Sequence, residues 1–497
     1  MYTQFSKLAA LLILSGLIGL TISASAMASS DEIQVKTVVY KNSAGISQPL
    51  TLLGGEGDDW AREILCNKSD SCAVFGFTHG SFGDTTDWLA MQITPSTTVQ
   101  WAETYGGTNR DMLWHAIKAS DGGYFAIGES QSMFFTGFKI FSPHYPPRPL
   151  YVKLDKAGKL LWAGNIALIT DTSGAELAAA YQTMDGGYLL AGTYWEGFPE
   201  SGEQPMPDIW SAPAPGKTKG YKYSYPLLLK LSKDGKPQWM RRYVFGENGG
   251  AALTATEMSS GHLFLTGAIY MNQTEHLFVL ETDAQGLPMH AQELQLPQHL
   301  GSNAALRLQD GNYLVVGHAI MESTPHAAFS ALFGPDLKFL GGTIYEDPIG
   351  IRPLGLVQGT DGRICVVGRT ENIQSGKVEG AAWLIDEHGD DLDELWLSGQ
   401  GNTELEGAAD LSSRNYRLLG DTNAFGSANY DLLLTTWNPA PSAATHTKQL
   451  TLVPFAPKIN DIQVSSDTAK LDIVRPIPPS LFNVKTLTSE SGSIGTQ

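Results

Sequence analysis

The stretch "SDGGYFAIGES" at residues 120–130 joins a glycine turn to a short apolar run that ends in another glycine. Nearly the same phrase returns as "MDGGYLLAGTY" from residue 184, "QDGNYLVVGHA" from 309 and "TDGRICVVGRT" from 360. An apolar stretch also precedes each turn, which is typical of a β-hairpin whose tight turn needs a positive φ. The phrase therefore predicts a repeated hairpin.

The glycine that closes each apolar run sets the period of the chain. It recurs at intervals of roughly fifty residues, and only the second and third units are clearly longer. Each unit adds a second hairpin, as in "YVKLDKAGKLLW" from residue 151, so that one unit holds four short strands. Such a unit is typical of a propeller blade rather than of a solenoid coil. The sequence thus predicts an all-β, seven-bladed β-propeller of four-stranded blades, with the closing glycines at Gly76, Gly128, Gly192, Gly267, Gly317, Gly368 and Gly420.

The last unit lacks its outermost strand. It offers "NYRLLGDT" and "YDLLLTTW" and then runs into "NPAPSAA", whereas "QPLTLLGG" at residues 48–55 resembles the end of a blade. We expect this N-terminal strand to close the ring, because closure removes an exposed sheet edge. Two packed β-sandwiches are an alternative that the length permits. The absence of a Pro- or Ser-rich linker before Pro439 favours the single ring.

The first residues have the layout of a cleavable secretory signal. Lys7 precedes an apolar run over residues 8–22, and small residues follow, with cleavage expected after Ala26 or Ala28. The run is too short for a transmembrane span. We therefore expect a signal peptide over residues 1–28 and a propeller over 31–438. For residues 439–497 we expect an extension with one or two strands and a disordered end from about Thr486.

This layout predicts an exported protein, periplasmic or extracellular, without stable membrane insertion. The net charge of −18 disfavours nucleic acid as a partner, because nucleic-acid binding needs clusters of Lys and Arg. Cys66 and Cys72 flank a polar turn, which in an oxidising compartment favours a disulfide, whereas Cys365 has the surroundings of a buried thiol. No histidine stands at ligand spacing from these cysteines, so we expect neither a metal site nor a cofactor.

The repeat motifs add a resemblance to a known family. With "SDGGYFAIG", "MDGGYLLAG" and "WAETYGG" at residues 101–107, the chain resembles secreted bacterial β-propeller repeat proteins, whose blades carry a D-G-G-Y hairpin and a tryptophan strand ending in Y-G-G. The resemblance covers about residues 48–437 and implies a propeller and an extracytoplasmic location, but no shared reaction. "LYVKLDKAGKLLW" is also similar to the tryptophan-docking repeat of quinoprotein dehydrogenases and of the outer-membrane assembly propeller, although the cysteine signature of the quinoproteins is absent.

Few residues suggest chemistry. Asp58 and Asp59 follow one glycine pair, and Asp111 occupies the same position in the next blade as Asp59. Paired carboxylates can act as acid and base in glycosidic cleavage. Short acids also brace turns, and recurrence at an equivalent repeat position favours bracing. The acid-rich "DEHGDDLDEL" at residues 386–395 lacks calcium-ligand spacing and predicts a solvated turn.

The lengthened second and third units are the most informative irregularity. Both carry an insertion between the second and third strands, on the propeller face that also carries the links between blades. Long insertions on a rigid scaffold commonly bear function. Their aromatic residues can stack on sugars, anchor a protein, or pack among themselves. These candidate binding residues are Phe134, Phe135, Phe138, Phe141, Tyr145, Trp195, Phe198, Trp210, Tyr221 and Tyr223.

The sequence therefore favours a non-enzymatic scaffold that captures a protein or glycan through these insertions. The alternatives are a carbohydrate-active enzyme, either a glycoside hydrolase or a lyase, with Asp58, Asp59 and Asp111 as its candidate acids, and an envelope assembly factor.

Overall fold

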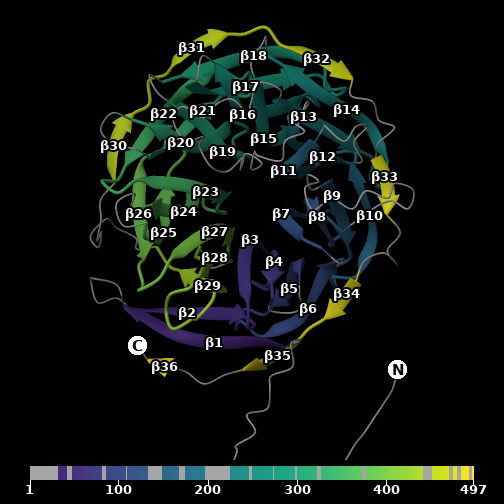
Figure 1. Cartoon of the computed structure of the whole chain (residues 1–497). Coiled ribbons are helices and arrows are strands. Elements are labelled where there is room, and N and C mark those ends of the chain that lie inside the picture. Colours follow the sequence, from purple (N-terminus) through teal and green to yellow (C-terminus); the bar gives the residue numbers. More distant parts are fainter. Residues whose placement is uncertain are drawn as a thin grey trace, which may run out of the picture.

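The computed structural model shows a ring of seven small antiparallel sheets around a central axis, a seven-bladed β-propeller (Figure 1). The innermost strand of every blade faces the axis. The residues described are 32–41, 47–80, 85–107, 109–132, 148–166, 174–195, 224–245, 249–271, 274–296, 299–321, 326–371, 376–412, 414–439, 450–468, 474–477, 483–491 and 495–496. The expected signal peptide, residues 1–28, lies outside them.

Six blades are built from four consecutive strands each. Blade 1 holds β3 (Asp58–Cys66), β4 (Cys72–His79), β5 (Thr86–Ile93) and β6 (Val99–Gly106). Blade 2 holds β7 (Asp111–Lys118), β8 (Tyr124–Ser130), β9 (Arg148–Leu154) and β10 (Leu160–Ile166). Blade 3 holds β11 (Gly174–Gln182), β12 (Tyr188–Trp195), β13 (Ser224–Leu231) and β14 (Pro237–Val244). Blade 4 holds β15 (Gly249–Glu257), β16 (Leu263–Met271), β17 (Thr274–Thr282) and β18 (Pro288–Gln295). Blade 5 holds β19 (His299–Arg307), β20 (Tyr313–Ile320), β21 (Ala327–Phe333) and β22 (Phe339–Glu346), and blade 6 holds β23 (Ile351–Gln358), β24 (Ile364–Glu371), β25 (Val378–Ile385) and β26 (Asp391–Leu397).

Blade 7 confirms that the N-terminal strand closes the ring. Its inner strands β27 (Thr403–Asp410), β28 (Tyr416–Thr422) and β29 (Asp431–Trp437) are completed by β2 (Ser47–Gly54) from the start of the chain. β2 runs antiparallel to β29, with Leu50 opposite Thr435 and Leu53 opposite Leu432. β1 (Glu32–Lys41) adds a fifth strand outside β2.

The C-terminal extension differs from the expectation of one or two strands and a disordered end. Seven short strands, which we call the outer belt, run backwards around the rim from blade 5 to blade 1 and end on β1 (Figure 1). Such short strands carry too little alternating pattern to be recognised in the sequence. They are β30 (Thr451–Pro454), β31 (Lys458–Asp461), β32 (Ser465–Thr468), β33 (Val474–Ile477), β34 (Asn483–Thr486), β35 (Thr488–Ser491) and β36 (Gly495–Thr496).

The closing glycines are required by a bulge in the facing innermost strand. In blade 7 the register between β27 and β28 shifts after Leu405, which lies opposite Gly420. The bulge presses a backbone carbonyl against the glycine, so that a β-carbon on Gly420 would lie 1.9 Å from the oxygen of Glu404. The other six blades repeat the shift, with carbonyl oxygens 1.9–2.1 Å from the equivalent point. The glycine therefore recurs in the sequence because the backbone of the innermost strand comes too close at this position for any side chain.

The turn glycines serve a different purpose, because they supply left-handed backbone. Gly122 has a φ of 84° and Gly186 one of 80° in the first hairpins of blades 2 and 3. Where the sequence lacks this glycine, Asp70 in blade 1 and Arg414 in blade 7 take the left-handed conformation instead. The turn therefore keeps its left-handed conformation in blades 1 and 7, where another residue replaces the glycine.

Among the described residues, seven large apolar clusters form the core, one between each pair of neighbouring blades. Aromatic residues of one blade also reach the second hairpin of the next. The ring of Trp101 packs against Gly158, and the hydroxyl of Tyr243 donates to the carbonyl of Gly286 at 3.0 Å. Each blade is therefore stabilised mainly by its neighbours.

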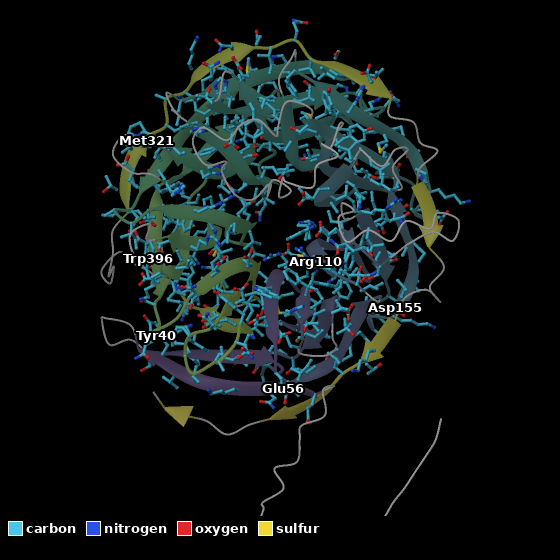
Figure 2. All side chains as sticks on the ribbon, in the orientation of Figure 1. Tyr40, Glu56, Arg110, Asp155, Met321 and Trp396 are labelled. Carbon is cyan, nitrogen blue, oxygen red and sulfur yellow. A yellow bond between two sulfur atoms is a disulfide. The ribbon has the colours of Figure 1, made fainter. Side chains whose placement is uncertain are left out.

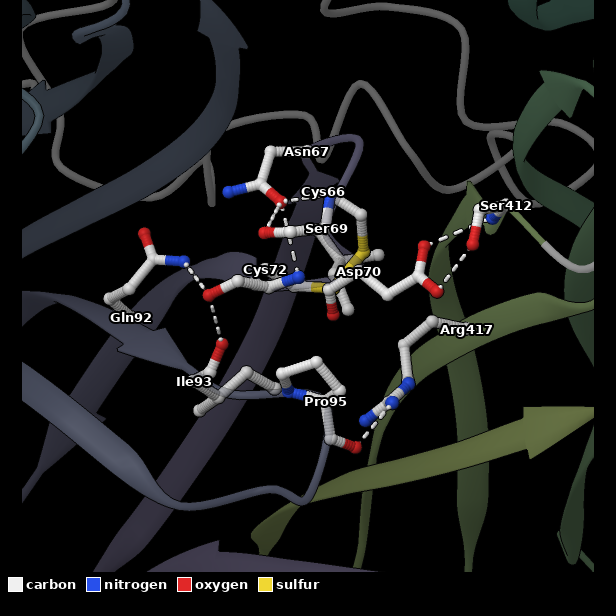
Figure 3. Close-up of a disulfide and its surroundings, with 12 residues drawn as sticks. Cys66, Asn67, Ser69, Asp70, Cys72, Gln92, Ile93, Pro95, Ser412 and Arg417 are labelled. Atoms are coloured by element: carbon white, nitrogen blue, oxygen red, sulfur yellow. Dashed lines mark hydrogen bonds between the residues drawn. A yellow bond between two sulfur atoms is a disulfide. The ribbon is translucent and has the colours of Figure 1, made fainter.

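The predicted disulfide joins Cys66 to Cys72 across the first hairpin of blade 1, and Cys365 is buried (Figure 3). Asp70 in the enclosed turn accepts hydrogen bonds from the backbone and the hydroxyl of Ser412 in blade 7, at 3.0 and 2.7 Å. The disulfide thus fixes a turn that ties blade 1 to blade 7, where the ring closes.

Candidate functional site

One end of the ring gathers the features that the sequence singled out. Because neighbouring strands are antiparallel, the links between blades and the connections from second to third strands emerge at the same end. We call this end the linker face. Its described residues include 55–57, 107 and 109–110 from the links between blades, and the strand ends at Ser130 and Trp195.

The two insertions leave from neighbouring blades on the linker face. In blade 2, Ser130 at the end of β8 is paired with Arg148 at the start of β9. In blade 3, Trp195 at the end of β12 is paired with Ser224 at the start of β13. The strands are thus paired up to the base of each insertion, so neither sheet needs its insertion to form. The other predicted binding residues lie outside the described residues, namely Phe134, Phe135, Phe138, Phe141, Tyr145, Phe198, Trp210, Tyr221 and Tyr223.

The candidate aspartates brace the links between blades. Asp59 and Asp111 are both fully buried. The backbone N–H of Gly55 donates to Asp59 at 3.0 Å, and that of Gly107 donates to Asp111 at 2.8 Å. Asp58 accepts a hydrogen bond from the backbone of Tyr430 in blade 7. These contacts support the bracing role and leave the carboxylates of Asp59 and Asp111 out of reach of a ligand.

A second acid lies beside Asp111. A β-carbon on Gly106 would lie 1.9 Å from a carboxylate oxygen of Asp87 and 3.0 Å from one of Asp111, so both acids crowd the same glycine. Burial raises the pKa of Asp111 to about 6, against hydrogen bonds from Ser130, Ser132 and Gly107. Burial, reinforced by the charge of Asp111, raises the pKa of Asp87 to about 7. The charged forms of the two buried carboxylates are therefore unfavourable in the folded protein at neutral pH.

This pair predicts a pH-dependent effect of Asp87→Asn. Since the pKa of Asp87 is raised from 3.8 to about 7, the folded protein binds this proton more tightly than the unfolded chain. The stability of the wild type should then fall between about pH 4 and pH 7. Asp87→Asn removes that loss, so it should leave stability at pH 4 nearly unchanged and raise it at pH 8. Urea titrations at both pH values test this, with the exposed Asp234→Asn as control. An equal effect of Asp87→Asn at both pH values would exclude titration as its cause.

Four aromatic side chains of blades 7, 1 and 2 contact one another near the linker face. The ring of Trp60 stacks on Phe77 at a centroid distance of 5.0 Å and on Tyr430 at 6.3 Å. Trp114 meets the same Phe77 edge-on at 6.2 Å. Trp60, Trp114 and Tyr430 are only partly buried. We call these four residues, from blades 7, 1 and 2, the aromatic group.

Arg62 lies beside the aromatic group, and a second arginine, Arg110, precedes β7. The guanidinium of Arg62 lies 5.0 Å from the ring centre of Phe77 and 5.3 Å from that of Trp114. It also forms an ion pair with Glu406 at 3.2 Å. Figure 2 shows Arg110 next to the centre of the ring, and its side chain is about half exposed. Partly exposed aromatic rings next to cations are suited to binding polar or anionic ligands.

Further along the axis, Glu63 and His115 face each other with 3.6 Å between Oε2 and Nε2. Burial raises the pKa of Glu63 to about 8, against a hydrogen bond from the backbone of Ile64 and with a smaller contribution from the charge of Glu406. Burial lowers the pKa of His115 to about 4. Both shifts favour a protonated carboxyl beside a neutral imidazole over an ion pair.

The residues around the axis are charged on the side of blades 6 and 7 and apolar on the side of blades 3 and 4. On blades 6 and 7, Arg369 forms an ion pair with Glu404 at 2.6 Å, and burial raises the pKa of Asp421 well above its ordinary value. On blades 3 and 4 the innermost strands contribute an apolar cluster of Ala178, Ala251 and Leu253. Among the described residues no group of three or more His, Cys, Asp or Glu is placed to hold a metal ion.

No protein-family model matches the chain, and a search of curated proteins also finds no match. Within the described part of the chain, no helix is long and apolar enough to cross a membrane. The candidate site therefore has to be interpreted from its own geometry.

Sequence reasoning missed the aromatic group and the charged residues beside it. Trp60 directly follows Asp59 in "GGEGDDWARE", and Trp114 comes three residues after Asp111 in "GGTNRDMLWH". Both lie on the innermost strands of neighbouring blades, but at different positions of the repeat.

Proposed function

We propose that this protein is a secreted or periplasmic, non-enzymatic scaffold that captures a protein or a glycan on its linker face. The observation that carries the proposal is the pairing at the base of the two insertions: the strands that flank them are paired as far as Ser130 with Arg148 and Trp195 with Ser224. Long segments that the sheets do not need, rich in aromatic residues and placed on neighbouring blades, are best explained by recognition.

The position of the aromatic group also indicates that the linker face is the binding surface. Trp60, Trp114 and Tyr430 are partly exposed at the end of the ring from which the insertions leave. Tryptophan and tyrosine next to arginine form the side-chain set that most often dominates the affinity of protein interfaces, and their rings also stack on sugars.

Binding measurements on substituted protein test this role. A ligand identified with a glycan array and with capture from cell-envelope extract should bind Trp114→Ala at least about tenfold more weakly, a loss of roughly 1.4 kcal/mol. The control is Met184→Ala, because Met184 is 68 % exposed in a hairpin turn at the opposite end of the ring. Equal affinity of both variants and the wild type would exclude the aromatic group from the binding surface. Captured outer-membrane proteins would favour the envelope assembly alternative.

One observation favours a second candidate, a carbohydrate-active enzyme. A carboxyl that is protonated at neutral pH, as burial makes Glu63, is suited to donate a proton to a glycosidic oxygen. This candidate uses Glu63 in place of Asp58, Asp59 and Asp111. Turnover of a polysaccharide or chromogenic glycoside that is lost in Glu63→Gln would establish it, whereas absence of turnover across a broad panel supports the scaffold.

A further inference from the structure

The end of the ring opposite the linker face carries the turns within the hairpins, and we call it the hairpin face. The turns between third and fourth strands include residues 155–159 in blade 2, 232–236 in blade 3 and 386–390 in blade 6. Each of them follows a third strand that starts at the linker face, so all three lie at this end of the ring. Figure 1 shows β25 and β26 of blade 6 across the ring from the strands of blades 2 and 3.

The turns of blades 2 and 3 expose positive charge. Lys156 and Lys159 are exposed in blade 2, and Lys233 and Lys236 are exposed in the equivalent turn of blade 3. Each turn holds two lysines and one aspartate, so each carries a net positive charge. Within the described part of the chain, no acid forms an ion pair with any of these four lysines.

The turn of blade 6 carries the opposite charge. It holds Asp386, Glu387 and Asp390, and the side chain of Glu387 is 56 % exposed. Asp390 is also exposed, and among the described residues no lysine or arginine forms an ion pair with Glu387 or Asp390. Blade 6 therefore presents negative charge on the side of the hairpin face that lies opposite the four lysines.

Apolar side chains lie on the hairpin face between these two charged sides. Leu287 and Met289 of blade 4 are 46 % and 56 % exposed, and Leu340 of blade 5 is 52 % exposed. Leu287 directly precedes β18, whereas Met289 and Leu340 are the second residues of β18 and β22. Blade 4 lies about midway around the ring between blades 2 and 3 on one side and blade 6 on the other (Figure 1). An apolar centre with a charged rim is the usual composition of a protein–protein interface.

We propose that the hairpin face binds a second copy of this protein, with the two hairpin faces in contact and related by a two-fold axis. An axis that lies in the interface beside blade 4 brings blade 6 of each copy over blades 2 and 3 of the other. The four lysines of one copy then face the acids of the second copy, and Leu287 and Met289 lie beside their own equivalents. The second copy is the partner that fits, because the charge pattern of this face is complementary to itself.

This surface is at the opposite end of the ring from the two insertions, so the proposal does not depend on the function proposed above. In the dimer both linker faces point outward. Replacement of residues 196–223 by a short turn should therefore leave dimerisation unchanged, which separates it from capture on the linker face.

Dimerisation through such contacts should be weak and sensitive to salt. Ion pairs between exposed side chains stabilise a contact only modestly, and salt screens them over about 8 Å at physiological ionic strength. Sedimentation velocity over a concentration series should show dimers at ~20 mM sodium chloride and mainly monomers at ~500 mM. A protein that stays monomeric at low salt over the whole series would overturn the proposal.

Charge reversal tests which sides of the hairpin face meet. The double variants Lys233→Glu, Lys236→Glu and Glu387→Lys, Asp390→Lys should each dimerise at least about tenfold more weakly than the wild type, because each brings like charges together. An equimolar mixture of the two variants should associate again, since opposite charges then meet on both sides. A mixture that stays monomeric where the wild type dimerises would overturn the arrangement.

Met289→Asp tests the position of the two-fold axis. The substitution places two carboxylates close together beside the axis, so we expect at least about tenfold weaker dimerisation. The matched control is Ile459→Asp, because Ile459 is 37 % exposed on the outer belt, away from the hairpin face. The control should dimerise as the wild type does. Wild-type dimerisation of Met289→Asp would contradict a contact centred on blade 4.

Discussion

Replacing Gly420 with alanine is expected to lower the free energy of unfolding by about 3 kcal/mol or more. The new β-carbon would lie 1.9 Å from the carbonyl oxygen of Glu404, and both groups belong to paired backbone that cannot move apart without breaking the hairpin. Urea titration followed by near-UV circular dichroism measures the loss.

Gly407 provides a matched control in the same hairpin. A β-carbon there would meet its nearest atom, the backbone nitrogen of Ile64, at 3.3 Å, so Gly407→Ala should cost no more than about 1 kcal/mol. Equal losses from the two variants would show that glycine is needed in this hairpin for a reason other than the bulge.

Placing a charge on the closing strand is expected to have a still larger effect. Leu53 in β2 is fully buried in the cluster between blades 7 and 1. Leu53→Asp would bury a carboxylate without a partner among apolar side chains, at a cost above about 4 kcal/mol. Because β2 is the strand that closes the ring, we expect the variant to lose its cooperative thermal transition and to self-associate through the exposed edge of β29.

Ser47→Asp introduces the same charge at the exposed start of β2 and should leave the melting temperature nearly unchanged. Circular dichroism and size-exclusion chromatography compare the two variants. A folded, monomeric Leu53→Asp protein would show that the N-terminal strand is dispensable for closure.

Much of the fold was accessible from the sequence because the propeller repeats one local constraint. The bulge places the same demand on every blade, so glycine recurs seven times and reveals the blade count. Closure was also predictable, since residues 48–55 resemble the end of a blade and blade 7 lacks its own outermost strand. The outer belt was not predictable in this way: strands of four residues with mostly exposed side chains are determined by the edges that they cover.

Only part of the candidate site could be predicted from the sequence, for a related reason. The sequence located Asp59 and Asp111 through their repeat position, and the structure shows that such recurrence reflects bracing. Trp60, Trp114 and Glu63 do not recur from blade to blade. Trp60 and Glu63 belong to blade 1 and Trp114 to blade 2, and Tyr430 of blade 7 stacks on Trp60 because the ring closes, an arrangement that no single repeat encodes.

The most direct test of the proposed binding role is to replace residues 196–223 by an Asn-Gly turn between the paired residues Trp195 and Ser224. The account predicts that the shortened protein unfolds at nearly the same temperature as the wild type and no longer binds the captured protein or glycan in a calorimetric titration. Full affinity in the folded, shortened protein would contradict it.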